Sequence, residues 1–352
     1  MTIKKIKIGN KFIGQNQPVF IIAEAGVNHN GRLDLALKLV DAAAAAHADA
    51  VKFQTFKAWQ LVTKDGEMAE YQKKNIGKTE SQPEMLKKLE LREEFYKPIL
   101  DRCKEKKIIF LSTPHGGFES VDFLHKLGLP AFKFGSGDLT NLPVLEYAAK
   151  FKKPMILGTG MATMKEVKEA VEVIKKAGND KIIMLHCTTN YPCLLDEVNL
   201  SAMVTMINKL DVLVGYSDHT LGVDVPIMAA TLGACILEKH FTLDKNMTGP
   251  DHVASAEPAE IKKIVDSVRN VKIILGGEVK KPNKSELPLI KIARKSVVAI
   301  RNIEKGEKFT KGNLGIKRPG DGLPPKFFNL VVGKKARKNL LSGATIKTND
   351  YK

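Results

Sequence analysis

Two histidines in the carboxyl-terminal half of the chain are placed where they could share one metal ion. His219 and His240 each follow a short apolar run, LVGYSDHT and CILEKHFT, of the kind that forms a buried strand. Strand alternation puts Ser217 on the side of His219 and Glu238 on the side of His240. In neighbouring strands the two imidazoles can reach the same ion. Two nitrogens leave several coordination positions of a divalent ion open to substrate and water. The alternative is that each histidine is a buried structural residue.

Lysines also occur inside apolar runs, at Lys52, Lys133 and Lys239. Burying an ammonium is costly unless an anion or a chemical role compensates. Lys52 shares a strand face with Gln54, and Lys133 precedes a Gly-Ser-Gly turn whose hydroxyl and backbone N–H groups could hold phosphate oxygens. The pattern predicts a cradle for a small phosphorylated acid, although hydroxyls at such junctions also cap helices. The hydroxyls in question are Thr113, Ser136 and Thr159.

Three more polar residues complete the candidate site. Glu24 ends the first apolar run and could act as a base or bind sugar hydroxyls. Asp251 follows the last run after the loop NMTGP and could do the same, and Tyr191 offers a phenol near His186.

Eight apolar runs of four to eight residues position these side chains. Each is rich in Val, Ile, Leu and Phe, as strands buried on both faces of a parallel sheet must be. Segments with apolar residues at helical spacing, such as MKEVKEAVEVIKKAG, alternate with them. This alternation predicts an α/β fold, a (β/α)8 TIM barrel with its reactive groups at the carboxyl ends of the strands. A doubly wound open sheet is the alternative, but no GxGxxG follows the first run.

Further segments flank and interrupt the barrel. Residues 1–18 are predicted to form a hairpin that closes the amino-terminal mouth, and hairpin plus barrel are expected to occupy 1–281. A long polar insertion at 57–91 is expected to shape substrate access. A linker rich in Pro, Lys and Ser is predicted at 282–294. Residues 295–352, with many Gly and Pro, are predicted to form a small β-rich domain that leans on another surface.

Composition limits the class of protein. The 352 residues are 43% hydrophobic, and an excess of lysine gives a net charge of +17, which suits anionic ligands. Aromatic content is only 6% and no RNP-like or helix-turn-helix signature occurs, which argues against nucleic acid. No run approaches the ~20 apolar residues of a membrane span, and MTIKKIKIGNKFIG lacks an export signal. We therefore expect a cytoplasmic protein without a membrane partner, with its four cysteines reduced.

A series of motifs resembles the sialic acid (N-acetylneuraminate) synthase family, which includes legionaminate and pseudaminate synthases. The motifs are IIAEAGVNHNG, KFQTF, LSTP, FKFGSGDLTNLP, GTGM, HCTTNYP, GYSDHTLG, EKHFTLD, GPDHVAS and IKRPGDG, in this order along nearly the whole chain. The resemblance implies a barrel that condenses phosphoenolpyruvate with an N-acetylmannosamine-type sugar and water, giving a nine-carbon 2-keto acid and phosphate. It also implies a carboxyl-terminal antifreeze-like (SAF) domain and a domain-swapped homodimer.

The resemblance also assigns roles to individual residues. His219 and His240 would bind a divalent metal ion, Mn2+ or Mg2+, and Glu24 and Glu238 would guide protons. Arg318 would reach the sugar's N-acyl group from the neighbouring subunit. Phosphoenolpyruvate would contact Lys52, Thr113, Lys133, Ser136 and Ser217, and the sugar would face Glu24, Gln54, Tyr191 and Asp251.

The chain departs from the family's pattern in three places. Gly158 stands where some members have serine and Thr189 where some have asparagine, so we expect Thr159 and Asn190 to substitute. The chain also has STPHGG where STPF is common, which leaves the role of His115 open.

The sequence also permits two other functions. A Schiff-base aldolase would use a buried lysine such as Lys133, and a carbohydrate- or polyanion-binding module would use the basic carboxyl-terminal domain. Within the family, the sugar is N-acetylmannosamine, its 6-phosphate or a 2,4-diacetamido-6-deoxy sugar. We expect an unphosphorylated sugar, with N-acetylmannosamine first, legionaminate synthesis as the alternative, and pseudaminate synthesis after it.

Overall fold

The computed structural model of the chain describes residues 5–76 and 81–352. Residues 1–4 of the predicted hairpin and 77–80 of the predicted insertion lie outside the described residues. The chain divides into two compact units, Met1–Gly276 and Gly277–Lys352, and each is described by itself.

The larger unit is an eight-stranded parallel barrel, which confirms the predicted fold class. Hydrogen-bonded neighbours run in the order β5, β4, β3, β10, β9, β8, β7, β6, and β5 contacts β6 where the barrel closes. The strands are β3 (Phe20–Gly26), β4 (Ala50–Thr55), β5 (Ile109–Pro114), β6 (Phe132–Phe134), β7 (Met155–Gly158), β8 (Ile182–His186), β9 (Leu213–Asp218) and β10 (Ile236–His240).

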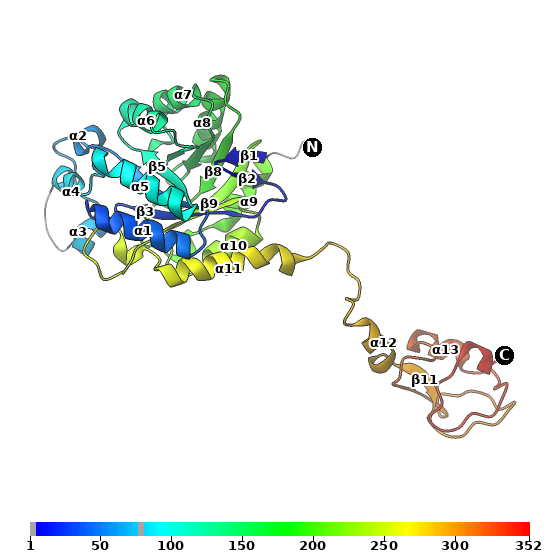
Figure 1. Cartoon of the computed structure of the whole chain (residues 1–352). Helices are drawn as coiled ribbons and strands as arrows, with labels where there is room; N and C mark the ends of the chain where they lie inside the picture. The colour runs from blue at the N-terminus through cyan, green and yellow to red at the C-terminus, as the bar shows by residue number, and fades with distance from the viewer. Residues whose placement is uncertain (1–4, 77–80) are drawn as a thin grey trace. The chain divides into compact units, whose positions relative to one another are not determined.

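Helices follow the strands and form an outer layer around the barrel (Figure 1). In this layer α1 contacts both α5 and α11. The described part of the polar insertion predicted at 57–91 contains three short helices, α2, α3 and α4. The helices are α1 (Leu33–Ala45), α2 (Ala58–Leu61), α3 (Glu70–Ile76), α4 (Gln82–Lys88), α5 (Glu93–Lys106), α6 (Gly117–Lys126), α7 (Leu142–Ala149), α8 (Met164–Lys176), α9 (Leu200–Lys209), α10 (Asp224–Thr231) and α11 (Pro258–Leu275).

Helix α8 shows how the local sequence sets these elements. Thr163 caps its amino terminus through a capping box with Glu166, which satisfies backbone N–H groups that the helix itself cannot bond. Its apolar residues recur at spacings of three and four, so one stripe packs on the barrel and the other faces remain polar. That stripe is Val167, Ala170, Val171 and Ile174.

A hairpin closes the amino-terminal end of the barrel. Strands β1 (Lys5–Ile8) and β2 (Lys11–Gly14) pair antiparallel around a turn at Gly9, whose φ of 57° favours glycine. The hairpin buries Ile6, Ile8 and Ile13 in one cluster with inward-facing strand residues such as Phe20, Leu111, Ile156, Ile183 and Ile236.

The smaller unit has its own apolar core. Strands β11 (Ser296–Ala299) and β12 (Leu314–Lys317) pair antiparallel, and α12 (Leu287–Ala293) and α13 (Phe328–Val331) are short. The predicted linker at 282–294 thus contains α12. The core comprises Val297, Ala299, Ile303, Phe309, Leu314, Leu323, Val331, Ala336, Leu340 and Ile346.

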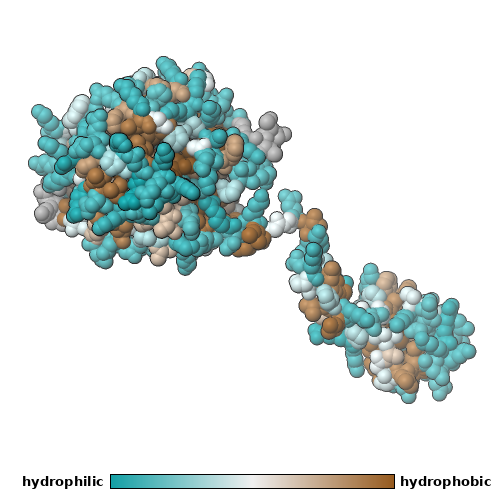
Figure 2. Space-filling view, viewed as in Figure 1, coloured by the Kyte–Doolittle hydropathy of each residue, from teal (hydrophilic) through white to brown (hydrophobic). Residues whose placement is uncertain are grey.

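Hydrophilic residues cover most of the visible face of each unit, and a hydrophobic patch lies at the carboxyl end of α11 (Figure 2). The patch includes Ile273 and Ile274, which are 77% and 78% exposed. No helix among the described residues is long and apolar enough to cross a membrane.

The hairpin should contribute measurably to barrel stability. Replacing Ile8, which is fully buried, with alanine leaves a cavity in the cluster at the barrel end, so we expect Ile8→Ala to lower the free energy of unfolding by about 3 kcal/mol. Phe12→Ala in the same hairpin is the control, because Phe12 is 52% exposed. Urea denaturation measures both, and equal effects of the two substitutions would show that the hairpin is not part of the core.

Candidate active site

A cavity of about 160 Å³ lies at the carboxyl ends of the barrel strands. Strand register and alternation bring its side chains to one level: Glu24 of β3 is aligned with Lys52 of β4 on one side and with His240 of β10 on the other. The lining residues are Glu24, Lys52, Gln54, Thr113, His115, Lys133, Gly135, Ser136, Gly137, Cys187, Thr189, Tyr191, Ser217, His219, Glu238 and His240. We call this the inner cavity.

Two carboxylates and two ammonium groups form a buried network in the inner cavity. Lys52 Nζ lies 2.8 Å from Glu24 Oε2 and 3.7 Å from Glu238 Oε2, and it donates to Thr113 Oγ1 at 3.0 Å. Lys133 Nζ lies 3.1 Å from Glu238 Oε1. Ser217 Oγ donates to the same oxygen at 2.9 Å. The two buried lysines therefore have the anions that the cost of burial requires.

The network gives its two carboxylates different proton affinities. Burial alone would raise the pKa of Glu238, but Lys133 and Lys52 outweigh burial and lower the pKa to about 2. Glu24 is equally buried and less strongly compensated, so burial raises its pKa. Burial opposes the charge of Lys133, yet Glu238 and Glu24 outweigh it and raise the pKa of the ammonium. Glu238 and Lys133 thus remain ionised, and Glu24 is the carboxyl suited to exchange a proton.

His219 and His240 lie beside each other at the mouth of the inner cavity. Their ring centroids are 5.5 Å apart, and Tyr191 packs against both rings. Burial lowers the pKa of His219 to about 4; burial, with the neighbouring His219, lowers that of His240 well below its usual value. His219 Nδ1 donates to the carbonyl oxygen of Thr188 at 2.6 Å, which leaves Nε2 with its lone pair free.

This histidine pair fits a divalent metal ion. Both imidazoles are neutral at pH 7, as metal ligands must be, and the bond to Thr188 holds one ring in a ligating tautomer. His240 Nδ1 is buried without a hydrogen-bond partner. Among the described residues no group of three or more His, Cys, Asp and Glu side chains surrounds a common point. The protein would thus supply two nitrogens and leave the other positions to substrate and water.

A second cavity, of about 290 Å³, adjoins the inner one. The two share Gln54, His115, Tyr191 and His240, and the second contains Asp251, whose pKa burial raises to about 6. Its wall is mixed: apolar side chains, most of them from the insertion, alternate with polar ones such as Gln72 and Gln82, and no lysine or arginine lines it within residues 5–76 and 81–352. Its other lining residues are Val27, Leu61, Val62, Gln72, Gln82, Met85, Leu86, Leu89 and Pro250. We call this the outer cavity.

The Gly135–Gly137 turn after β6 forms one wall of the inner cavity. Ser136 Oγ accepts a hydrogen bond from Gly160 N at 3.0 Å. A Cβ atom at Gly158 would come within 2.9 Å of the same hydroxyl, so glycine there leaves room for Ser136.

The two expected substitutions were wrong, whereas buried Lys239 has the compensating anion that its burial requires. Thr159 donates to the carbonyl of Leu185 and Asn190 donates to Glu197, so neither substitutes in the inner cavity, which Thr189 lines instead. Lys239 pairs with Asp218 and donates to Thr220 O at 2.7 Å, so its charge is neutralised within the barrel wall.

Other predicted residues lie as follows. Tyr191 lies against His219 and His240, while His186 bonds Val198 O at 2.9 Å. Arg318 belongs to the smaller unit, where it is exposed directly after β12, so its role remains a prediction. Sequence reasoning missed Cys187, which lines the inner cavity, and no sequence signal marks it.

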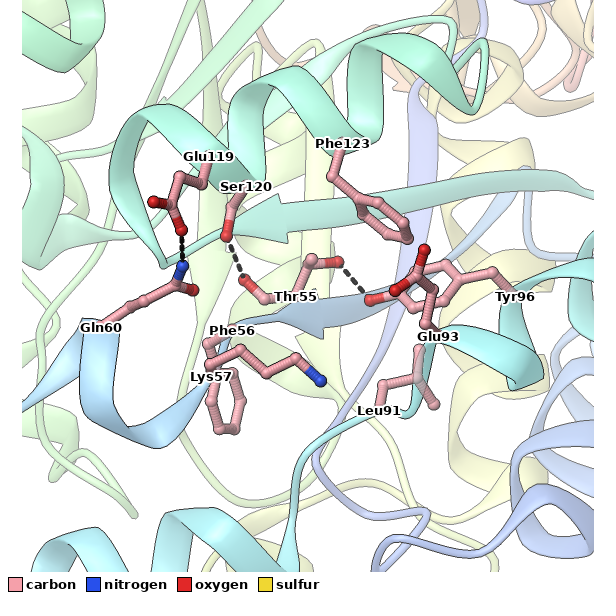
Figure 3. A pocket seen from close by; sticks show the side chains of 10 residues that line it. All are labelled: Thr55, Phe56, Lys57, Gln60, Leu91, Glu93, Tyr96, Glu119, Ser120 and Phe123. Atoms are coloured by element: carbon pink, nitrogen blue, oxygen red, sulfur yellow. Dashed lines mark hydrogen bonds between the residues drawn. The ribbon is translucent and has the colours of Figure 1, made fainter.

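A third cavity, of about 220 Å³, lies between α5, α6 and the end of β4, and it has a different character (Figure 3). Its polar side chains bond one another: Thr55 Oγ1 lies 2.7 Å from the hydroxyl oxygen of Tyr96, and Gln60 donates to Glu119. None of the predicted catalytic or metal-binding residues lines it. The inner cavity, with its buried charges and adjacent imidazoles, is therefore the candidate active site.

Comparisons with known proteins identify the family of the chain. The profile of the NeuB family matches residues 39–280, and that of the SAF domain matches residues 294–352. The chain is 46% identical over 344 residues to N,N'-diacetyllegionaminic acid synthase of Legionella pneumophila, covering 96% of each chain. It is 49% identical over 321 residues to the protein of the same name from Campylobacter jejuni, covering 91% of this chain and 96% of that one.

A solved structure is also similar. It is that of N-acetylneuraminic acid (sialic acid) synthetase from Leptospira borgpetersenii in complex with citrate, with a TM-score of 0.72 and 36% sequence identity. The match covers 82% of this chain and 95% of that one.

Removing one charge from the buried network should destabilise the protein. In Glu238→Gln, Lys133 loses its paired carboxylate and Lys52 loses one of two, so we expect the free energy of unfolding at pH 7 to fall by about 3 kcal/mol. Glu169→Gln, on the exposed face of α8, is the matched control and should change it by less than about 0.5 kcal/mol. Denaturant titration distinguishes them, and a Glu238→Gln protein as stable as the control would contradict the role of the network.

Proposed function

The chain belongs to the NeuB family and is an enzyme of nonulosonic acid synthesis, and from this premise we propose that it condenses phosphoenolpyruvate with an unphosphorylated acetamido sugar and water. The products are a nine-carbon 2-keto acid and inorganic phosphate. The observation that carries the proposal is the inner cavity, in which two buried lysines lie beside a pair of neutral imidazoles.

Phosphoenolpyruvate binds in the inner cavity. The cationic and hydroxyl side chains available to it are those of Lys52, Thr113, Lys133, Ser136 and Ser217, and backbone N–H groups of the Gly135–Gly137 turn can receive phosphate oxygens. The buried ammoniums and hydroxyls hold the anion rigidly, with its enol carbon toward the outer cavity.

His219 and His240 would hold a divalent ion, manganese or magnesium, which would supply Lewis-acid polarisation of the sugar's aldehyde oxygen. The enol carbon of phosphoenolpyruvate attacks the aldehyde carbon, and water adds to the cationic C2 that results. Glu24, whose pKa is raised, accepts the proton from that water, and the C2–O bond to phosphate then breaks. Glu238 stays ionised and positions the two lysines.

Two features favour a 2,4-diacetamido-2,4,6-trideoxymannose as the sugar over N-acetylmannosamine. The apolar side chains that the insertion contributes to the outer cavity can contact methyl groups of a 6-deoxy sugar and of two acetamido groups, while its glutamines can bond the polar groups. Both relatives at 46–49% identity are named N,N'-diacetyllegionaminic acid synthases. A 6-phosphate would find no lysine or arginine in the outer cavity as far as the described residues go. Gln54, Tyr191 and Asp251 face this sugar.

The partner and domain assignments continue the same proposal. Residues 295–352 form the SAF domain of a domain-swapped homodimer, in which Arg318 reaches the sugar's N-acyl group in the neighbouring subunit's site. Because Arg318 is exposed in its own unit, it is available for such a contact.

The Schiff-base alternative conflicts with the charge of Lys133. A lysine attacks a carbonyl only as a neutral amine, whereas Glu238 and Glu24 keep Lys133 protonated by raising its pKa.

Phosphate release tests the reaction and the sugar together. Purified protein with phosphoenolpyruvate and manganese is given each sugar in turn. We expect kcat/KM to be highest for the diacetamido sugar, at least about tenfold lower for N-acetylmannosamine because the C6 methyl and the second acetamido group are missing, and lowest for its 6-phosphate. Release that needs no manganese, or no release with any sugar, would contradict the proposal.

Loss of one imidazole tests the metal site. We expect His240→Ala to abolish turnover, because one nitrogen cannot hold the ion, while the thermal unfolding temperature stays within a few degrees of the native value. The exposed His47→Asn is the control and should retain full activity. Manganese binding, measured by calorimetry, should be lost in the first variant alone, and metal-dependent activity in His240→Ala would refute the assignment.

A further inference from the structure

His115 occupies the boundary between the inner and outer cavities. It follows β5, and its backbone N donates to Thr55 O at 2.9 Å, which continues the pairing of β4 with β5 and holds the residue in place. Its side chain is 21% exposed and lines both cavities. In the proposed reaction this imidazole has no role.

Two contacts join the His115 ring to the Gly135–Gly137 turn. His115 Nδ1 lies 3.2 Å from Asp138 Oδ2, at the end of the short 3-10 helix Ser136–Asp138. The ring also lies close over Gly135, since a Cβ atom there would come within 2.9 Å of His115 Cε1. The imidazole is thus tied to the turn that carries Ser136, and Asp138 fixes its orientation.

The donors of the inner cavity are largely committed to one another. Lys52 and Lys133 bind carboxylates, and Ser217 donates to Glu238. His115 differs because its carboxylate partner takes Nδ1, and the described residues provide no hydrogen bond to its Nε2. In an imidazolium both ring nitrogens are donors, so one ring can bind Asp138 through Nδ1 and an anion through Nε2.

We propose that His115, held by Asp138, is a further phosphoenolpyruvate-binding residue whose Nε2–H donates to a phosphate oxygen. The inference rests on the proposed function, because it takes the Gly135–Gly137 turn as the place of the phosphate. Both contacts described above join the ring to this turn, which favours the phosphate over the sugar as its ligand.

Two substitutions distinguish the roles of the two ring nitrogens of His115. His115→Asn keeps a donor near the position of Nδ1, toward Asp138, and loses the donor at Nε2. His115→Gln extends a donor toward the position of Nε2. Isothermal calorimetry on the full chain with manganese and no sugar measures the affinity for phosphoenolpyruvate and for inorganic phosphate, so the readout does not depend on turnover.

We expect His115→Asn to lower the affinity for both anions by about tenfold or more, because a hydrogen bond to an anion is lost. The affinities of His115→Gln should stay within about threefold of those of the native protein. Thermal unfolding identifies any variant that fails to fold. Native affinity in both variants, or a change confined to the KM of the sugar, would overturn the inference. A native protein that binds no phosphoenolpyruvate would instead overturn the proposed function.

Discussion

The barrel mouth depends on the mutual compensation of four buried charges. Lys52 pairs with Glu24 and Glu238, and Lys133 pairs with Glu238. The two lysines without the carboxylates, or the two carboxylates without the lysines, would be uncompensated buried charges at a cost of several kcal/mol. The network is close to neutral as a whole. The lysines are already balanced by the two carboxylates. A phosphorylated anion that enters the network therefore adds negative charge that the lysines do not compensate. This is a physical reason for a divalent cation at the adjacent histidines, because the cation compensates the incoming anion.

The network divides the chemistry between groups of the same type. Glu238 lies next to two ammoniums and stays ionised, whereas Glu24 keeps a raised pKa because its burial is less fully compensated. The two cavities also differ in the elements that line them: strand residues and the loops directly after the strands line the inner cavity, and the insertion contributes much of the lining of the outer one. Rigid strands hold the groups that need fixed geometry, and the insertion can vary with the sugar.

Sequence patterns predicted the barrel and the strand-borne part of the site, because a period of two and a shared strand end determine which side chains meet. Glu24, Lys52 and His240 come together for that reason. The same patterns could not distinguish Lys133, which faces the cavity, from Lys239, which pairs with Asp218, since both occur in apolar runs. Loop residues were harder still. The approach of Asp138 to His115 depends on two turns whose conformations periodicity does not determine.

The hairpin at the amino-terminal end has a kinetic consequence. Its isoleucines fill the bottom of the barrel, so ligands reach the inner cavity from the carboxyl end, where the outer cavity adjoins it and shares four lining residues. In the proposed reaction, a sugar seated in the outer cavity covers that side of the inner one. This arrangement favours an ordered encounter in which phosphoenolpyruvate associates before the sugar.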